Sequence, residues 1–353
     1  MSEQQRAVAL TMGDGAGIGP EILAKAFLLA PEQTSGCFVV GDLATLRRAS
    51  ACVTQALVLP PLPCMVIDSP AQALTAPPRC LPVYPLPGLT SPPAWGQVSG
   101  EAGRYAGACV SWAAQAALRG DVAALVTAPL HKEALAEGGA PYDQYPGHTE
   151  LLQSEAAAYL HQPVHEVPVR MMLANDELRV VLVSIHVSLR EAIERVTLPA
   201  VSDTLRIADA SLRRMLGRAP RLLVAGLNPH AGEGGLFGTE EMTVIGPAVQ
   251  AAQVRGVQVR GPLAPDTVFM VARQSQAGPE PVDAVIAMYH DQGLIPVKYL
   301  GVEEGVNVTL GLPLVRTSPD HGTAFDIAGT ARASEASLVQ AIRVAKQLAG
   351  WPR

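Results

Sequence analysis

The sequence predicts an α/β protein made of two domains with largely parallel sheets. Short aliphatic runs alternate with helical patterns, which is the order of elements in such folds. The chain has 353 residues, which is long for one hydrophobic core and favours two domains. Polar clusters follow the aliphatic runs directly, as expected where parallel strands end at a ligand site.

The predicted strands share a run of aliphatic or β-branched residues bounded by polar residues. They span residues 6–12, 38–40, 122–126, 179–185, 221–227 and 282–288. The predicted helices lie between them, and the first begins with Pro and Glu, which suits a first turn. They span residues 20–29, 101–118, 149–160, 201–216, 239–254 and 335–348.

Residues 59–93 differ from the rest because they are dense in proline. Proline lacks the N–H group that a helix or a sheet ladder needs, so we expect mostly extended loop or edge strand. Apolar residues remain frequent there, which favours an excursion within the first domain over a flexible interdomain linker.

Composition excludes several classes of protein. The net charge is −6 with acids and bases interspersed, so no basic face for nucleic acid is indicated. The five cysteines form no CxxC pair, which favours reduced thiols over a disulfide framework or a Cys-zinc site. No secretory signal and no apolar run of about 18 residues is visible, so we expect no membrane partner and a cytoplasmic protein.

The glycine-rich segment that follows the first predicted strand covers residues 13–20. A dinucleotide fingerprint counted from Gly13 would need glycine where the chain has Ile18, so the segment fails that test. Two interpretations stay open at this point: a tight strand-to-helix turn, or a close approach of backbone to a ligand.

Three of the eight histidines lie just beyond a predicted strand. They are His186, His230 and His290. Each taken singly is more often a hydrogen-bonded structural residue, but three imidazoles at equivalent strand ends favour a divalent-metal site. His161 and His165 have helical spacing, yet Pro163 lies between them, so we interpret both as surface residues.

Two further groups of residues suggest an anion site. His148 and Thr149 open a predicted helix, whose N-terminal N–H groups favour anions, although Thr149 could serve only as the helix cap. Lys298, Asn307 and Arg316 follow the last predicted strand, and arginine supplies a fork that suits phosphate or carboxylate. The loop at residues 321–329 could grip an adenosine, but alone this signal is weak.

Several blocks of the sequence resemble one enzyme family in order and spacing. The blocks run from Met12 to Gly329 and read MGDGAGIGPEI, TAPLHKEAL, YPGHTE, GLNPHAGEGGLFGTEE, GPLAPDTVF, MYHDQGLIPVKY and GVNVTLGLPLVRTSPDHGTAFDIAG. In these blocks the chain resembles the 4-hydroxythreonine-4-phosphate dehydrogenase family. The resemblance implies a fold like isocitrate and isopropylmalate dehydrogenases, which hold their cofactor without the dinucleotide fingerprint.

The resemblance also implies an architecture. Residues 1–131 and 305–353 would form a discontinuous first domain, and residues 132–304 a second domain with the metal ligands and dimer contacts. The active site would lie in the cleft between domains at the interface of a homodimer, with metal ligands drawn from both subunits.

Residue roles follow from the same resemblance. One divalent ion (Zn, Mg or Co) would be held by His186, His230 and His290. The phosphorylated hydroxy-acid substrate would be bound by His148, Thr149, Lys298, Asn307 and Arg316, and NAD or NADP by His321, Gly322, Thr323 and Asp326. Lys298 or Asp291 could move the proton, and Asp266 could orient a ligand or a neighbouring group.

The implied reaction oxidises 4-phosphohydroxy-L-threonine to a β-keto acid, which decarboxylates to 3-amino-2-oxopropyl phosphate in pyridoxal phosphate biosynthesis. Gly15 stands where relatives usually carry Pro, and TAPLHKEAL looks closer to a branch resembling 4-phospho-D-threonate and 4-phospho-D-erythronate dehydrogenases. A further branch oxidises the dihydrodiol of terephthalate, which has no phosphate; Asn307 and Arg316 argue for a phosphorylated substrate. Outside this family, a metal hydrolase without redox chemistry or a small-ligand binding protein stays open.

Overall fold

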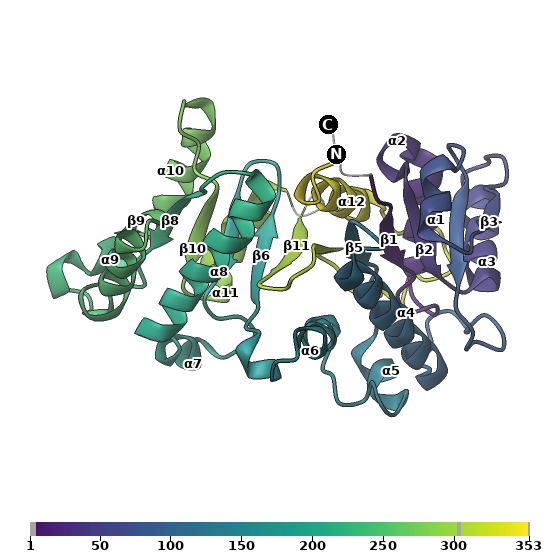
Figure 1. Ribbon diagram of the computed structural model, residues 1–353, viewed down its shortest axis with the longest axis horizontal. Coiled ribbons are helices and arrows are strands. Elements are labelled where there is room, and N and C mark those ends of the chain that lie inside the picture. The colour runs from purple at the N-terminus through teal and green to yellow at the C-terminus, as the bar shows by residue number, and fades with distance from the viewer. Residues whose placement is uncertain (1–4, 302–304, 352–353) are drawn as a thin grey trace. The chain divides into compact units, whose positions relative to one another are not determined.

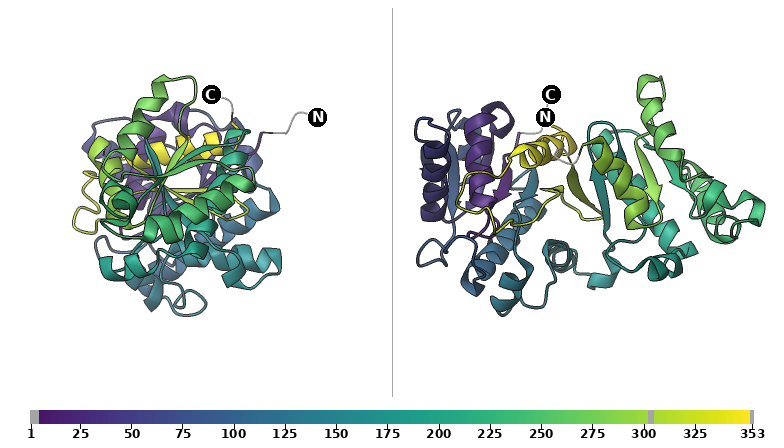
Figure 2. Two further views of the ribbon diagram at one scale, coloured as in Figure 1. Left: turned by 90° about the vertical axis from the view of Figure 1, so that its left-hand side faces the viewer. Right: turned by 180° about the vertical axis from the view of Figure 1, so that it is seen from behind.

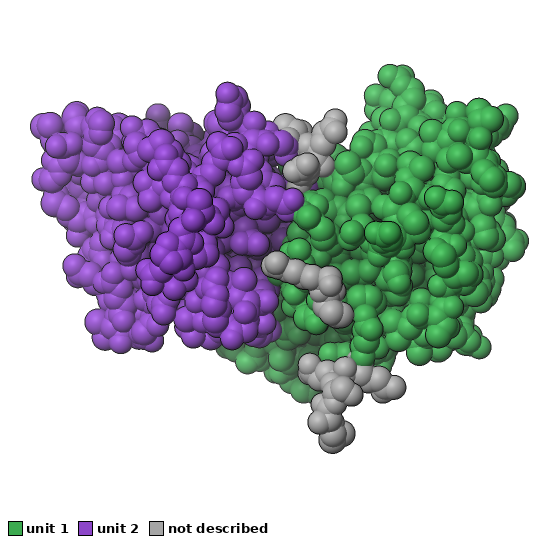
Figure 3. All heavy atoms as spheres, turned by 90° about the horizontal axis from the view of Figure 1, so that it is seen from above, with its two compact units in different colours: residues 1–168, 312–353 green, residues 169–311 purple. Residues whose placement is uncertain are grey.

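The computed structural model describes residues 5–301 and 305–351 and confirms the predicted α/β fold. The chain divides into two compact units (Figure 3). Unit 1 comprises Met1–Pro168 and Leu312–Arg353, and unit 2 comprises Val169–Gly311. The sequence expectation placed the divisions after residues 131 and 304. The first division lies later because α5 (Lys132–Glu137) and α6 (His148–Leu160) pack on α4 (Gly100–Arg119) of unit 1. The second lies later because β11 (Val306–Leu310) pairs with β6 (Arg170–Ala174) of unit 2.

Unit 1 is built on a parallel sheet with the strand order β3-β4-β2-β1-β5-β12. Its strands are β1 (Val8–Thr11), β2 (Cys37–Gly41), β3 (Cys64–Val66), β4 (Leu81–Pro85), β5 (Ala124–Thr127) and β12 (Arg316–Pro319). Since all six strands run the same way, the carboxyl ends of β1, β2 and β5 lie at one edge of the sheet.

Some helices of unit 1 begin at a side chain that caps their first free N–H groups. The helices of this unit are α1 (Gly19–Leu29), α2 (Pro31–Thr34), α3 (Leu43–Ala56), α4 (Gly100–Arg119), α5 (Lys132–Glu137), α6 (His148–Leu160) and α12 (Ala336–Leu348). Asp42 caps α3 by accepting the N–H of Thr45 at 2.6 Å, and Ser99 caps α4. Although α12 is distant in sequence, it packs beside α1 and β5 (Figures 1 and 2).

The proline-rich residues 59–93 belong to unit 1, as predicted. Most of the segment is loop, but it also contains β3 and β4 and a 3-10 turn at Pro70–Thr75. The short strand β3 lies at the edge of the sheet, where strands with a nearby proline are tolerated. The prediction of extended loop and edge strand is therefore confirmed.

Unit 2 has a mixed sheet with the strand order β11-β6-β7-β10-β8-β9. Its strands are β6 (Arg170–Ala174), β7 (Arg179–Leu182), β8 (Arg221–Ala225), β9 (Gln258–Leu263), β10 (Ala284–Ala287) and β11 (Val306–Leu310). The strands β7, β10, β8 and β9 are mutually parallel, whereas β6 runs antiparallel to β7 and β11. The carboxyl ends of β7, β8 and β10 therefore share one edge.

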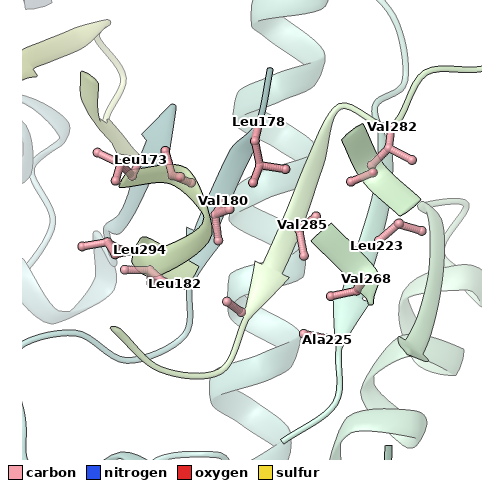
Figure 4. Packing of buried hydrophobic residues seen from close by; sticks show 13 residues of the cluster. Leu173, Leu178, Val180, Leu182, Leu223, Ala225, Val268, Val282, Val285 and Leu294 are labelled. Carbon is pink, nitrogen blue, oxygen red and sulfur yellow. The ribbon is translucent and has the colours of Figure 1, made fainter. Parts of the chain in front are cut away.

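Helices cover both faces of the unit 2 sheet. They are α7 (Leu189–Glu194), α8 (Leu198–Leu216), α9 (Gly246–Val254), α10 (Val268–Gln274) and α11 (His290–Leu300). Alternate strand residues such as Val180, Leu223 and Val285 pack against α10 and α11 in one buried cluster (Figure 4). Because α11 begins three residues after the last residue of β10, this packing also fixes the carboxyl end of β10.

Three smaller findings complete the fold. The predicted helix at residues 239–254 contains a π-helical turn at Glu241–Ile245 before α9, and such wide turns are frequent at functional sites. All five cysteines are free thiols. Within residues 5–301 and 305–351, the structure has no helix that is long and apolar enough to cross a membrane.

Candidate functional site

A buried guanidinium lies at the strand ends of unit 1. Arg316 begins β12 and is only 4% exposed, and its Nε and Nη2 donate to Oγ1 of Thr127 at 3.2 and 2.7 Å. Burial lowers the pKa of Arg316 to about 10, while the negative charge of Glu150 acts in the opposite direction. The group is therefore still charged at neutral pH, and its burial needs compensation by polar partners.

His148 lies close to this guanidinium. It is the first residue of α6, and its Nε2 is buried without a hydrogen-bond partner among the residues that the structure describes. Burial and the charge of Arg316 hold the pKa of His148 well below its usual value, so its ring is neutral at pH 7. Thr149, beside it, is half-buried. A buried ring nitrogen without a partner is typical of a position that a polar ligand completes.

The glycine-rich segment after β1 forms a tight turn packed on the segment after β5. Gly13 has φ +72°, and a Cβ at this position would lie 2.3 Å from the carbonyl oxygen of Pro129. The next residue, Asp14, donates its N–H to that same oxygen at 2.9 Å, and its Oδ1 accepts the N–H of Ala16. Burial raises the pKa of Asp14. These contacts support the first of the two interpretations, a turn that requires glycine.

The predicted cofactor loop is held against the start of α1. Ile18 donates its N–H to the carbonyl of Thr323 at 3.0 Å, and the buried carboxylate of Glu21 accepts the N–H groups of Gly329 and Ala331. Thr323 is buried against Gly17, so its side chain holds the loop in place. Of the four residues predicted to bind cofactor, the other three are open to a ligand: His321, Gly322 and Asp326.

Two of the three predicted metal ligands lie together in unit 2. The ring centroids of His186, after β7, and His290, at the start of α11, are 5.6 Å apart. Two imidazoles bound at about 2.1 Å to one ion would hold their centroids at roughly this separation. Nδ1 of His290 is 2.7 Å from Oδ1 of Asp291, which leaves Nε2 as the ligand atom. The pair therefore fits a divalent ion.

His230 is presented differently. It lies in the 3-10 turn Pro229–Gly235, is exposed, and has its ring 6.1 Å from that of Phe237. Among the described residues, no group of three His, Cys, Asp or Glu side chains is close enough to hold a metal ion. One chain therefore supplies two adjacent imidazoles, and His230 does not complete a three-ligand group with them.

A cavity of about 660 Å³ adjoins His230 in unit 2. Asp266 and Asp291 line it, together with apolar residues of α10 and α11. Lys298, on α11, and Asn307, on β11, are half-buried in the same unit. The five predicted substrate residues thus divide between the units, with His148, Thr149 and Arg316 in unit 1.

Sequence reasoning missed three polar residues that shape these strand ends. Thr127 directly follows the predicted strand 122–126, but nothing in the sequence indicates that it holds Arg316. Glu241 and Gln292 bond the main chain near His230 and His290. Their position inside the blocks GTEE and YHDQG was the only available signal.

Two α/β units, one with a buried guanidinium and one with paired imidazoles at its strand ends, define an α/β protein suited to an anionic ligand and a divalent metal ion. The family model of the pyridoxal phosphate biosynthetic protein PdxA matches residues 33–345. The chain belongs to this family, which confirms the family predicted from the sequence blocks.

Individual relatives match over nearly the whole chain. A 4-hydroxythreonine-4-phosphate dehydrogenase from Beijerinckia indica is 46% identical, with 97% of this chain and 94% of the relative covered. A D-threonate 4-phosphate dehydrogenase from Salmonella typhimurium is 45% identical, covering 98% and 100%. A solved structure of 4-hydroxythreonine-4-phosphate dehydrogenase from Klebsiella pneumoniae is 41% identical, covering 98% and 100%, with a TM-score of 0.85. The chain is accordingly an oxidoreductase of this family.

Proposed function

We propose that this protein is a metal-dependent, NAD- or NADP-linked dehydrogenase that oxidises 4-phosphohydroxy-L-threonine. The product would be a β-keto acid that loses carbon dioxide to give 3-amino-2-oxopropyl phosphate. The single observation that carries a phosphorylated substrate is the buried charge of Arg316 beside the unpartnered Nε2 of His148.

The phosphate end of the substrate would bind in unit 1. The buried guanidinium of Arg316 donates to the neutral oxygen of Thr127 and stays charged, with the negative charge of Glu150 also acting on it. A phosphate would add the opposite charge and several acceptor oxygens, which match the planar fork of arginine. Thr149, next to His148 at the start of α6, would donate to the same group, where helix N–H groups favour anions.

The reacting carbon would lie near the histidines. When bound, a divalent ion would supply Lewis-acid polarisation of the substrate oxygen, and the nicotinamide would accept the hydride. Asp291 holds the His290 ring through its Nδ1, which fixes the orientation of Nε2. Lys298 or Asp291 would move the proton, and Asp266, in the wall of the cavity beside His230, would orient a ligand. In unit 1, His321 and Asp326 would contact the cofactor.

A second copy of this chain would complete the site as a homodimer. Large apolar side chains around His230 are exposed, including Leu236 at 73% and Tyr299 at 90%. Others on the same unit are Phe237, Met242 and Ile295. Exposed apolar side chains gathered around an incomplete ligand set favour a protein interface. A two-fold interface would let His230 of one chain join the His186 and His290 pair of another.

A second substrate is favoured by a specific observation. The D-threonate 4-phosphate dehydrogenase from Salmonella typhimurium is almost as similar as the first relative, and the block TAPLHKEAL looks closer to that branch. This substrate carries a hydroxyl where 4-phosphohydroxythreonine carries an ammonium group. Both share the phosphate, so the Arg316 site does not distinguish them.

A kinetic panel tests the proposal. We would compare reduction of NAD and NADP with 4-phosphohydroxy-L-threonine, 4-phospho-D-threonate, 4-phospho-D-erythronate and the terephthalate dihydrodiol as substrates. The highest kcat/KM with 4-phosphohydroxy-L-threonine supports the proposal, and the highest value with 4-phospho-D-threonate or 4-phospho-D-erythronate supports that second branch. A preference for the dihydrodiol would contradict the phosphate role of Arg316. Absence of nicotinamide reduction with every substrate would favour a metal hydrolase or a binding protein.

A further inference from the structure

The strand ends of unit 2 that lead to the three histidines are joined by side chains. Gln292 lies in the first turn of α11, two residues after His290. Its Oε1 accepts the N–H of Met288 at 2.7 Å, and its Nε2 donates to the carbonyl of Gly226 at 2.7 Å. Met288 follows β10 and Gly226 follows β8, so one amide links the ends of two adjacent strands.

The end of β7 joins the same network. Ser184 is buried, and its Oγ donates to the carbonyl of Met288 at 2.9 Å. The main chain of Met288 therefore accepts a hydrogen bond from Ser184 at its carbonyl and donates one from its N–H to Gln292. The main chain just before His186, His230 and His290 is thus connected through two side chains.

Glu241 holds the segment that leads to His230. Its Oε1 accepts the N–H groups of Leu227 and Asn228, each at 2.7 Å, and its Oε2 accepts Nδ2 of Asn228 at 3.0 Å. The carboxylate is only 4% exposed. A Cβ on Gly232 would lie 2.8 Å from its Oε2, so the loop closes tightly over it. All these bonds go to the chain itself, so Glu241 would act on a ligand only through the loop.

The loop needs such support because its backbone is unusual. His230, Ala231 and Glu233 all have positive φ, between +44° and +54°. Residues other than glycine keep this conformation only where their surroundings determine it strongly. His230 is exposed, so packing of its ring contributes little to its placement. The hydrogen bonds of Glu241, together with the bond from the Ala231 N–H to the carbonyl of Asn228, therefore constrain the main chain from which this imidazole projects.

We propose that Glu241 and Gln292 are positioning residues for the divalent metal ion, because they fix the main chain from which His230 and His290 project. This inference rests on the proposed metal role of the histidines. It assigns neither residue to the metal or the substrate directly. Groups that orient ligands from outside the coordination sphere typically contribute 10- to 100-fold to metal affinity.

The test uses Co²⁺ titrated into the metal-free full-length enzyme, followed by visible absorption and calorimetry. Glu241→Gln would place an amide N–H₂ group against a hydrogen-bond donor of the loop. Gln292→Met would remove both hydrogen bonds of Gln292 while keeping a side chain of similar size. We expect each variant to bind Co²⁺ about 10- to 100-fold more weakly than the unmodified enzyme. Circular dichroism and thermal unfolding without metal would establish that both variants are folded.

Matched controls separate positioning from charge and from stability. Glu240→Gln removes one charge at the neighbouring position but keeps an oxygen that accepts Nδ2 of Asn228, 2.7 Å away. Gln276→Met removes a glutamine that bonds the carbonyls of Ala272 and Val282. Asp283→Asn replaces a buried carboxylate at the opposite end of β10 by a neutral amide. This carboxylate accepts hydrogen bonds from Arg218 and from the Arg221 N–H.

The controls should keep the Co²⁺ affinity within about twofold, even where Asp283→Asn lowers the melting temperature. Unchanged affinity in both Glu241→Gln and Gln292→Met would overturn the positioning role while leaving the proposed metal site intact. An equal loss in Asp283→Asn or Glu240→Gln would also overturn it, because stability or charge would then explain the effect. Failure of the unmodified enzyme to bind Co²⁺ would overturn both this inference and the proposed metal site.

Discussion

The two units present their polar residues at strand ends in opposite ways. In unit 1 the guanidinium of Arg316 is buried and Nε2 of His148 is enclosed without a partner among the described residues. In unit 2 the rings of His186 and His230 are exposed, and His290 is half-buried. Burial defines the first site, whereas hydrogen bonds to the main chain define the second.

This difference indicates how much of each site a single chain supplies. In unit 1 the charge of Arg316 and its neighbours Thr127 and His148 are already in place within one chain. The histidines of unit 2 give two adjacent rings and a separate third, so they depend on further assembly. Mutation and subunit mixing test whether the anion site of unit 1 is complete in one chain and whether the metal site of unit 2 is shared between chains.

The largest effect is expected at the paired histidines. Replacing His186 or His290 by Ala should reduce turnover to background and weaken Co²⁺ binding strongly, because a three-ligand site loses affinity sharply when one ligand is removed. Steady-state kinetics and Co²⁺ titration would measure both effects. The fold should persist, since neither ring belongs to the hydrophobic core.

The matched controls are the two histidines interpreted as surface residues. His161 ends α6 in the left-handed conformation and His165 lies in the 3-10 turn Val164–Glu166, and both are exposed. Their replacement by Ala should change kcat/KM less than about twofold. Similar losses at all four positions would mean that the histidines were sorted wrongly.

The second effect concerns sharing between chains. If His230 comes from a partner, mixing His230→Ala with His290→Ala should restore activity, because one site of each heterodimer regains every ligand. Random mixing makes half of the dimers heterodimers, so about a quarter of the unmodified activity is expected. Mixing His186→Ala with His290→Ala is the control and should restore none, since those rings are adjacent in one chain. Restoration in the control, with or without restoration in the first mixture, would contradict this assignment, because His186 and His290 would then come from different chains.

The third effect concerns the anion site of unit 1. Arg316→Ala should lower kcat/KM for a phosphorylated substrate by roughly 10- to 150-fold, because a hydrogen bond to a charged group contributes about 1.5–3 kcal/mol. An unphosphorylated analogue should be affected much less. Arg170→Ala is a close control, since Nε of Arg170 also donates to a threonine, Thr204, at 2.7 Å but in unit 2. Equal losses for both substrates would remove Arg316 from phosphate binding.

The strands were predictable where complete burial requires an unbroken run of aliphatic residues. The aliphatic runs of β1, β5 and β10 are fully buried, so their pattern alone indicated them. The helix α11 was not predicted because Gly293 and Pro296 weaken its local signal. Leu294 and Val297 stabilise it by packing into the core of unit 2, which is a tertiary effect.

The same limit applies to the site. The position of each histidine beyond a strand was predictable, because parallel strands bring their ends to one edge of a sheet, whereas their joint role in binding a metal ion stays a prediction. Gln292 was not, because its bond to Gly226 joins residues 66 apart and no local pattern indicates which carbonyl an amide reaches. The burial of Arg316 was equally hidden, since its partner Thr127 is 189 residues away.

The smallest effect is a pH dependence of stability that originates in unit 1. The pKa of His148 is held below its usual value, so as pH falls through about 6.5 the unfolded chain takes up a proton that the folded chain refuses. The free energy of unfolding therefore decreases as the pH decreases through this window, with a limiting slope of about 1.4 kcal/mol per pH unit. His148→Gln should flatten this slope, as measured by urea unfolding between pH 7.5 and 5.5.

Asp14 supplies a control of opposite sign in the same unit. Burial raises its pKa, so the folded chain keeps a proton that the unfolded chain has released, and this contribution to stability grows as pH falls. Asp14→Asn should therefore steepen the loss of stability toward acid, whereas His148→Gln reduces it. The amide can still accept the N–H of Ala16, which bonds Oδ1 at 2.9 Å, so the turn should survive. Equal slopes in the unmodified protein and His148→Gln would mean that the ring of His148 takes up a proton as readily in the folded chain as in the unfolded chain, and the enclosed anion site of unit 1 would lose its support.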